Sequence, residues 1–264
     1  MTSRRLSGRA LHGGATVSVV LERREGPIAI AQGDRERRLD ELTVIAGDRA
    51  TVLRDAEGAL RVSTIEHLLS AFAGLGVHDG VRIVVEGPEL PVLDGGSVAF
   101  CEALRAIEAP RGEPRVRVLA AGSIELGRSR YDFAPGPSVD VAVELEWSDA
   151  RLVPRAAWVG DESVYIARIA PARTFAFASE VEALAERGLG QGVDPESVVV
   201  VGETILCSGR PFEADEPARH KLLDLLGDLY VHGGPPRGRV LARRPGHGVT
   251  HRAIAEARAR GLVG

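Results

Sequence analysis

The chain contains 264 residues, 44% of them hydrophobic and 27% charged, which is the balance of a globular protein with one large domain or two of ordinary size. A formal net charge of −4 argues against nucleic acid as its main partner. The N-terminus carries no signal peptide and no apolar run approaches the ~20 residues that cross a membrane, so we expect a cytoplasmic protein without a transmembrane segment.

The first part of the chain combines short strands with two helices. Alternating apolar and polar residues indicate the strands, and the first helix opens with Ser-x-x-Glu, the spacing of a capping box, and ends near a glycine. In chain order we predict strands at 15–22, 28–31 and 51–53, a helix at 63–75, a strand at 81–85 and a helix at 97–108.

Residues 109–114 have the proline- and glycine-rich composition of a linker, which predicts two domains, 1–110 and 115–264. The second part repeats the order of the first, with strands, a helix, a strand and a last helix. We predict strands at 115–120, 139–146, 163–169 and 196–201, a helix at 179–187, a helix that opens at Asp215-Glu216-Pro217, a strand at 239–243 and a helix at 249–260.

The helix that opens at Asp215 carries polar residues on one face. His220, Asp224 and Asp228 recur every fourth residue, which places them one turn apart on the same side. An imidazole and a carboxylate in this arrangement can bind one divalent metal ion, although a solvated polar face gives the same spacing. Lys221 favours chemistry, because it is the chain's only lysine and the other 32 of its 33 Lys and Arg residues are arginine.

The earlier helix supplies a third ligand if the two parts of the chain are a duplication. Its segment beginning at Glu66-His67 aligns loosely with the segment beginning at His220-Lys221, so pseudo-twofold packing would bring His67 next to His220. His67, His220 and Asp224 would then form a His₂-carboxylate zinc site at the interface between the domains, with Fe²⁺ as the alternative ion. Glu66 is the expected general base, unless it serves only the capping box.

Hydrolysis of an amide also needs positive charge for the tetrahedral intermediate and a proton for the leaving nitrogen. His247 lies in a glycine-flanked tip that we expect to expose its side chain, and Asp228 would keep it charged. Lys221 would add a second positive charge. The remaining histidines are expected to be exposed: His12, His78, His232 and His251. Four arginines precede His247 and suit an anionic substrate and ordinary surface equally well: Arg237, Arg239, Arg243 and Arg244.

Five sequence blocks, in order, resemble the UDP-3-O-acyl-N-acetylglucosamine deacetylases of lipid A biosynthesis. They are STIEHLLSAFAGLG at 63–76, EGPELPVLDG at 86–95, RTF at 173–175, RHKLLDLLGDL at 219–229 and GH at 246–247. The resemblance implies an α+β fold of two domains with duplicated topology, each a β-sheet, with the helices packed between the two sheet layers.

The resemblance also implies a role for individual residues. His67, His220 and Asp224 match the zinc ligands, and Glu66 the general base. His247 matches the general acid or electrostatic stabiliser, with Asp228 as its partner. The remaining matches are Thr174, which hydrogen-bonds the reacting oxygen, and the substrate contacts Phe175 and Lys221; Arg244 is a further candidate for binding the anionic substrate.

The implied reaction is removal of acetate from UDP-3-O-acyl-N-acetylglucosamine in the synthesis of lipopolysaccharide, by an enzyme that we expect to be a monomer. Two alternatives stay open: a divergent paralogue that deacetylates another N-acetylated amino sugar, and an inactive homologue that binds and regulates a true enzyme. A zinc peptidase is disfavoured because no H-E-x-x-H helix is present. The segment 188–197 departs from the family pattern, and acyl-chain length is not encoded in any motif.

Overall fold

A computed structural model describes residues 2–47 and 49–264, and its backbone is organised around two five-stranded sheets. The first sheet has the order β1-β2-β8-β3-β4, with β1 Ser3–Arg9, β2 Thr16–Arg23, β8 Val81–Glu86, β3 Ala29–Gln32 and β4 Arg35–Arg38. The second has the order β9-β10-β16-β11-β12, with β9 Gly122–Leu126, β10 Ser129–Ala134, β16 Gly238–Arg243, β11 Val139–Glu144 and β12 Arg155–Trp158.

The two sheets have the same topology, which confirms the predicted duplication. In each sheet the last strand of the unit inserts in the middle, where it pairs in parallel with the third strand and antiparallel with the second. The other neighbours in both sheets are antiparallel. A parallel pair requires a long crossover connection, and in each unit a helix lies on that crossover.

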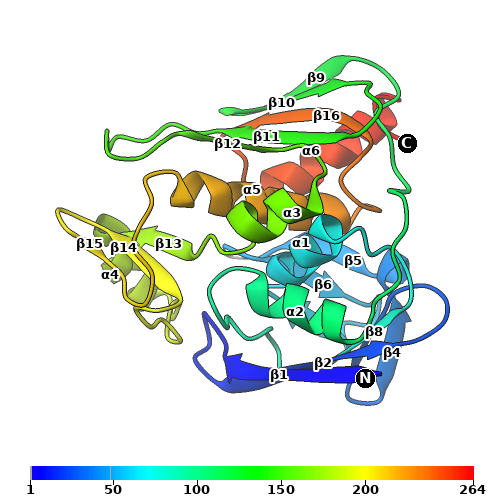
Figure 1. Ribbon diagram of the computed structural model, residues 1–264, viewed down its shortest axis with the longest axis horizontal. Helices are drawn as coiled ribbons and strands as arrows, with labels where there is room; N and C mark the ends of the chain where they lie inside the picture. Colours follow the sequence, from blue (N-terminus) through cyan, green and yellow to red (C-terminus); the bar gives the residue numbers. More distant parts are fainter. Residues whose placement is uncertain (1, 48) are drawn as a thin grey trace.

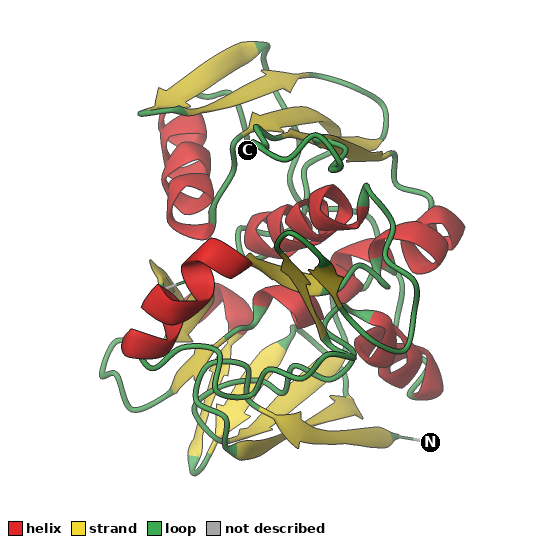
Figure 2. Cartoon of the chain, turned by 90° about the vertical axis from the view of Figure 1, so that its left-hand side faces the viewer, coloured by secondary structure: helices red, strands yellow, loops and turns green. Residues whose placement is uncertain are grey.

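Helices fill the space between the two sheets, as predicted (Figures 1 and 2). In each unit one helix precedes the last strand and another follows it. α1 Glu66–Gly74 and α2 Val98–Ala106 flank β8, and α5 Glu216–Tyr230 and α6 His247–Ala259 flank β16. Their apolar faces and the inner faces of both sheets form one continuous hydrophobic core. Among the helices of residues 2–47 and 49–264, none combines the length and the apolarity that crossing a membrane requires.

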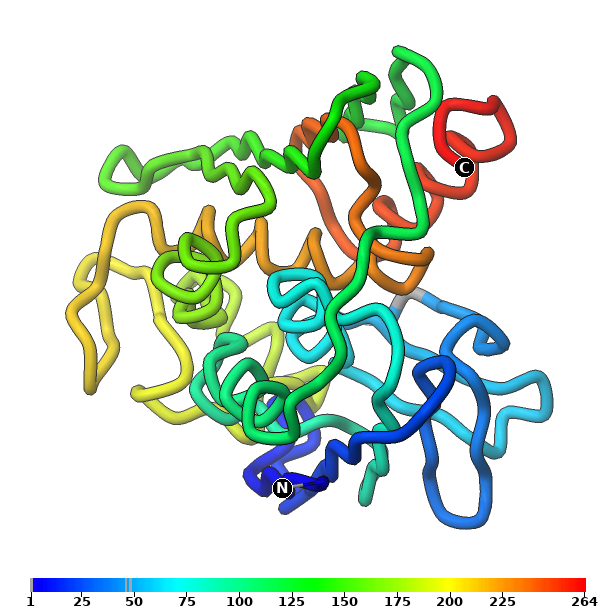
Figure 3. Tube along the Cα trace, turned by 45° about the vertical axis from the view of Figure 1, so that its right-hand side comes forward, coloured from blue at the N-terminus to red at the C-terminus, as the bar shows by residue number. Residues whose placement is uncertain are grey.

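Each unit also carries a small three-stranded sheet before its crossover helix. The first consists of β5 Thr43–Ala46, β6 Thr51–Arg54 and β7 Arg61–Ser63, and the second of β13 Thr174–Phe177, β14 Val198–Val201 and β15 Ile205–Leu206. The remaining helical segments are α4 Ala178–Glu186 and three shorter ones: η1 Leu39–Glu41, α3 Glu162–Val164 and η2 Tyr165–Ile169. The chain passes from one large sheet to the other along the outside of the molecule, between α2 and β9 (Figure 3).

Two predicted strands are wrong. Residues 163–169 are helical, because Asp161 caps the N–H of Val164 and a single π-turn follows, closed by the Ala170 N–H on the Tyr165 carbonyl. This turn buries Tyr165 and Ile169 on one side, so burial overrides the β-branched composition of the segment. Residues 115–120 contribute isolated bridges at Arg117 and Val118, whereas β9 and β10, which the prediction missed, follow them.

The packing of α1 against α5 depends on Gly227. A Cβ atom added at Gly227 would lie 2.0 Å from the carbonyl oxygen of Glu66, so only glycine permits this approach. The close contact brings the first turn of α1 against the C-terminal part of α5, within two helical turns of the predicted metal ligands His220 and Asp224.

Gly227→Ala is therefore expected to lower the free energy of unfolding by about 1–3 kcal/mol, the range for overpacking of a well-packed core. Thermal and urea unfolding measure the change. Gly13→Ala is the control, because the nearest atom to its added Cβ is Glu89 Oε2 at an ordinary 3.7 Å. Equal stability of both variants and the wild type would contradict the role of Gly227.

Candidate active site and metal centre

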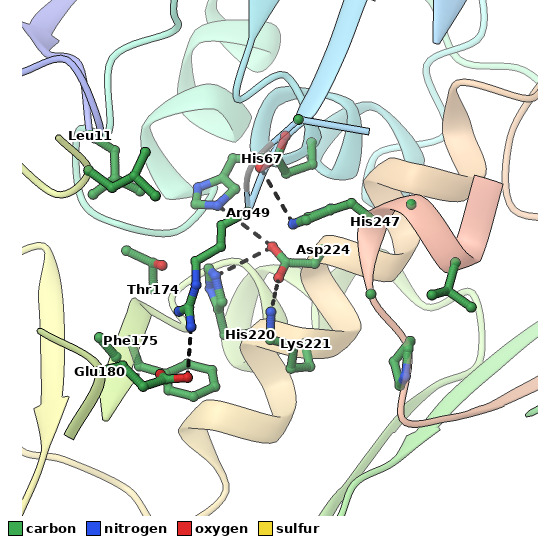
Figure 4. Close-up of a pocket in the computed structure, with 18 of the residues that line it drawn as sticks. Leu11, Arg49, His67, Thr174, Phe175, Glu180, His220, Lys221, Asp224 and His247 are labelled. Carbon is green, nitrogen blue, oxygen red and sulfur yellow. Dashed lines mark hydrogen bonds and ion pairs between the residues drawn. The ribbon is translucent and has the colours of Figure 1, made fainter. Parts of the chain in front are cut away.

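The crossing of α1 and α5 places the rings of His67 and His220 side by side. Their centroids are 5.1 Å apart and the rings are nearly perpendicular, at 77°. Asp224, one turn after His220, lies 3.4 Å from His220 Nε2 and 3.7 Å from His67 Nε2 through its Oδ1. One ligand atom from each of the three buried residues lies within 4.8 Å of the other two, so the group has the geometry to hold a metal ion (Figure 4).

The chemistry of these donors fits a divalent cation such as Zn²⁺. Burial lowers the pKa of both histidines, that of His67 to about 3, so each imidazole is neutral and offers a lone pair. Burial alone would raise the pKa of Asp224, but the nearby positive charges, Lys221 first and then His247, outweigh it and hold that pKa well below its ordinary value. The Ala172 carbonyl, 3.0 Å from His220 Nδ1, fixes the tautomer that leaves Nε2 free for the metal.

Glu66, the first residue of α1, points toward the same centre. Its carboxylate is 2% exposed, and its Oε2 accepts the backbone N–H of Thr51 at 3.0 Å. Burial raises its pKa to about 7, with His247 opposing the shift and Asp224 and Asp228 adding to it. A carboxylate with a pKa near neutrality is suited to accept a proton from water. Because Ser63 Oγ donates to the Pro88 carbonyl and Glu66 binds Thr51, the capping-box interpretation is wrong.

His247 lies opposite Glu66 and is paired with Asp228. Its Nδ1 is 3.0 Å from both carboxylate oxygens of Asp228, and its Nε2 is 3.9 Å from Glu66 Oε1. Burial lowers the pKa of His247, but the two carboxylates outweigh it and raise that pKa to about 10. The expected exposed tip is wrong: His247 is the first residue of α6, and its side chain is 11% exposed.

The side chains predicted to contact the substrate lie around this centre. Lys221 Nζ forms an ion pair with Asp224 Oδ2 at 2.8 Å and lies 5.7 Å from the centroid of the Phe175 ring. Phe175 packs edge-on against His220, and Thr174 precedes it at the start of β13, beside the metal-binding group (Figure 4).

Arg244 also reaches this region, where its guanidinium contacts Glu146. The three arginines before it pair with acidic side chains: Arg237 with Glu113, Arg239 with Asp140, and Arg243 with Asp132 and Glu144.

Most of the predicted site residues line one cavity of about 1080 Å³: Glu66, His67, Thr174, Phe175, His220, Lys221, Asp224, Arg244 and His247. Its floor carries the metal-binding group, Glu66 and His247. Apolar side chains line a large part of the wall: Leu11, Val44, Leu145, Trp147, Phe177, Leu184, Leu189, Val193, Val198 and Val249. An ion pair between Arg49 and Glu180, 2.7 Å long, spans the same cavity (Figure 4).

The expectation that the remaining histidines are exposed is wrong. His78 and His251 are 9% and 8% exposed, and His12 and His232 are partly buried. His251 follows His247 by one helical turn, and this i,i+4 spacing is a signal that could have placed it near the site. Thr51 gave no such signal, because it reads as an ordinary strand residue, yet it contacts both Glu66 and Asp228.

Comparisons with known proteins point to one family. A model of the family described as LpxC, UDP-3-O-acyl N-acetylglycosamine deacetylase, matches residues 2–258. The chain is 37% identical over 215 residues to a UDP-3-O-acyl-N-acetylglucosamine deacetylase of Phenylobacterium zucineum, covering 80% of this chain and 73% of that protein. It is 31% identical over 261 residues to proteins of the same name from Brucella melitensis and Brucella ovis, covering 94% of this chain and 90% of each relative.

Removal of one member of the donor group should abolish tight metal binding. We expect His220→Ala to weaken Zn²⁺ affinity by more than the roughly 10–100-fold that loss of an outer-sphere partner causes. Competition with a chromophoric chelator measures the affinity. The control is His78→Ala, which removes a buried histidine that stacks on Tyr230 outside the donor group. Unchanged affinity in His220→Ala would refute the assignment.

Proposed function

Because the chain belongs to the UDP-3-O-acyl-N-acetylglucosamine deacetylase family, we propose that it is a zinc-dependent hydrolase that removes acetate from UDP-3-O-acyl-N-acetylglucosamine. An enzyme of this family hydrolyses an amide bond and produces an amine and a carboxylic acid. The step belongs to lipid A biosynthesis. We also assign the two units to domains at 1–110 and 115–264, with the site between them.

One observation carries this proposal: a general base and a cationic acid lie on the same cavity floor as a metal-binding group. Glu66 and His247 approach to 3.9 Å, yet their pKa values are shifted to about 7 and about 10. At neutral pH Glu66 can therefore accept a proton while His247 remains protonated. Amide hydrolysis requires both properties, because water must lose a proton and the leaving nitrogen must gain one.

Each of these residues has a separate role in the proposed reaction. Glu66 accepts a proton from the attacking water molecule. When bound, a divalent cation at His67, His220 and Asp224 supplies Lewis-acid polarisation of the amide carbonyl and lowers the pKa of water. The Thr174 hydroxyl and the positive charge of His247 stabilise the oxygen of the tetrahedral intermediate. His247 then donates its Nε2 proton to the leaving nitrogen as the C–N bond breaks, while Asp228 holds Nδ1.

The cavity wall suits both ends of the proposed substrate. The apolar side chains of α4 and the following loop, Leu184, Leu189 and Val193, can accommodate a fatty acyl chain. Lys221, stacked over Phe175, and Arg244 provide positive charge for the diphosphate of a UDP-linked sugar. An inactive binding homologue is disfavoured, because the ligand group, the base and the cationic acid are all retained.

Glu66→Gln tests the proposed base. The substitution preserves shape and removes proton affinity, so we expect kcat to fall about 10²–10⁴-fold with Zn²⁺ binding retained. Acetate release from UDP-3-O-acyl-N-acetylglucosamine, at several acyl lengths, measures it. Glu86→Gln, which breaks an exposed pair with Arg5, is the control. A fully active Glu66→Gln enzyme would exclude Glu66 as the base. If the wild-type enzyme releases acetate from another N-acetylated amino sugar and not from this substrate, the protein is a divergent paralogue.

The pH dependence of kcat/KM should be bell-shaped. Activity rises as Glu66 loses its proton, at or below about pH 7 because a bound cation lowers the pKa of that carboxyl further. Activity falls as His247 loses its proton near pH 10. His247→Gln should therefore lower kcat and remove the basic limb, and a basic limb that persists unchanged would assign it to another group.

A further inference from the structure

Thr51, the first residue of β6, contacts both carboxylates that flank His247. It is completely buried; its backbone N–H donates to Glu66 Oε2 at 3.0 Å, and its hydroxyl donates to Asp228 Oδ1 at 2.6 Å. One residue from the small sheet of the first unit thus holds the proposed base and the partner of the proposed acid at a fixed separation. The reaction described above does not use it.

The direction of the Thr51 hydrogen bond determines the protonation of two further side chains. Thr51 has one hydroxyl proton, and Asp228 receives it, so the contact of 2.9 Å between Thr51 Oγ1 and His251 Nε2 must be donated by His251. A neutral His251 with its proton on Nε2 has a lone pair on Nδ1. His232 Nε2 lies 3.1 Å from that nitrogen and must donate to it.

The result is an ordered chain of donors, from His232 to His251, to Thr51 and finally to Asp228. Both histidines are neutral at pH 7, because burial lowers the pKa of His251 and lowers that of His232 to about 4. The chain of donors ends on Asp228 Oδ1, which accepts the hydrogen bond from Thr51. His247 Nδ1 lies 3.0 Å from both oxygens of the same carboxylate. His251 Nε2 is itself 3.8 Å from Asp228 Oδ1, too far to replace Thr51.

We propose that His251 is a positioning residue for the deacetylation: by donating to the Thr51 hydroxyl, it fixes the Asp228 carboxylate and hence the direction in which His247 presents Nε2. This inference rests on the proposed function for its kinetic consequence only. The simpler interpretation is that His251 is a buried histidine whose hydrogen bonds are satisfied and whose role is to stabilise α6. The two interpretations differ in what happens when the donor is kept and the imidazole is lost.

Two pairs of variants separate these interpretations. Thr51→Val keeps the shape and the backbone N–H but removes the hydroxyl, whereas Thr51→Ser keeps the hydroxyl. His251→Leu removes the donor, whereas His251→Gln places an amide N–H near the position of the imidazole Nε2. Thr51→Val loses a hydrogen bond to a carboxylate, which corresponds to a change in rate of about 10-fold or more, whereas His251→Leu loses one to a neutral hydroxyl, which corresponds to about 10-fold at most. We expect both variants to lower kcat by more than about 3-fold, Thr51→Val the more strongly, with unchanged KM and Zn²⁺ affinity. Thr51→Ser and His251→Gln should remain within about 3-fold of wild type.

A second measurement does not depend on any substrate. The ring ¹H and ¹⁵N resonances of His247 report the Nδ1 hydrogen bond to Asp228 at a fixed pH. We expect them to shift in Thr51→Val and His251→Leu and to stay near their wild-type positions in Thr51→Ser and His251→Gln.

Equal losses in His251→Leu and His251→Gln, or wild-type kinetics and resonances in His251→Leu, would overturn the inference. If the wild-type protein does not release acetate, the proposed function fails, and the resonances alone still decide whether His251 positions His247.

Discussion

The site depends on the contact between two helices that lie far apart in the sequence. The first turn of α1 meets the C-terminal part of α5 at Gly227, where the backbone of Glu66 occupies the space of a missing side chain. Because His220, Asp224 and Asp228 are spaced by one turn along α5, the same contact brings three turns of that helix within reach of Glu66 and His67. A larger residue at position 227 would separate the proposed base Glu66 from the pair of His247 and Asp228, and His67 from the other two candidate metal ligands.

The buried charges of the site stabilise one another. His247 carries a positive charge at the N-terminus of α6, where the helix dipole disfavours a cation by ~0.3–1 kcal/mol. One pKa unit corresponds to ~1.4 kcal/mol, and the pKa of His247 is raised from 6.5 to about 10, so Asp228 and Glu66 outweigh both the dipole and the burial. The same argument applies to Lys221. Burial alone would lower its pKa, but the ion pair with Asp224 outweighs burial, so the pKa is raised above its ordinary value.

The sequence could predict those parts of the site that depend on the spacing of residues along a single helix. The face of α5 follows from the i,i+4 pattern, and the likeness between the segments at Glu66 and His220 indicated the meeting of α1 and α5. Outside the site, residues 163–169 were wrongly predicted as a strand, because a π-turn that buries Tyr165 and Ile169 has no periodic pattern in the sequence. Thr51 escaped because its two contacts are set by how β6 lies against α1 and α5, which only the tertiary structure determines.

The site is asymmetric although the two large sheets share one topology. Both units place a three-stranded sheet before their crossover helix, but β5, β6 and β7 pair antiparallel whereas β13 and β14 are parallel. The sheet of the first unit contributes Thr51, which contacts Glu66, Asp228 and His251, and lines the cavity with Val44. The sheet of the second unit contributes Thr174 and Phe175 to the same cavity. The helices differ in the same way, because α1 offers its first two residues and α5 offers its middle turns. The two small sheets therefore take different tasks in the proposed reaction: the first holds Glu66 and Asp228 through Thr51, and the second places Thr174 and Phe175 in the cavity.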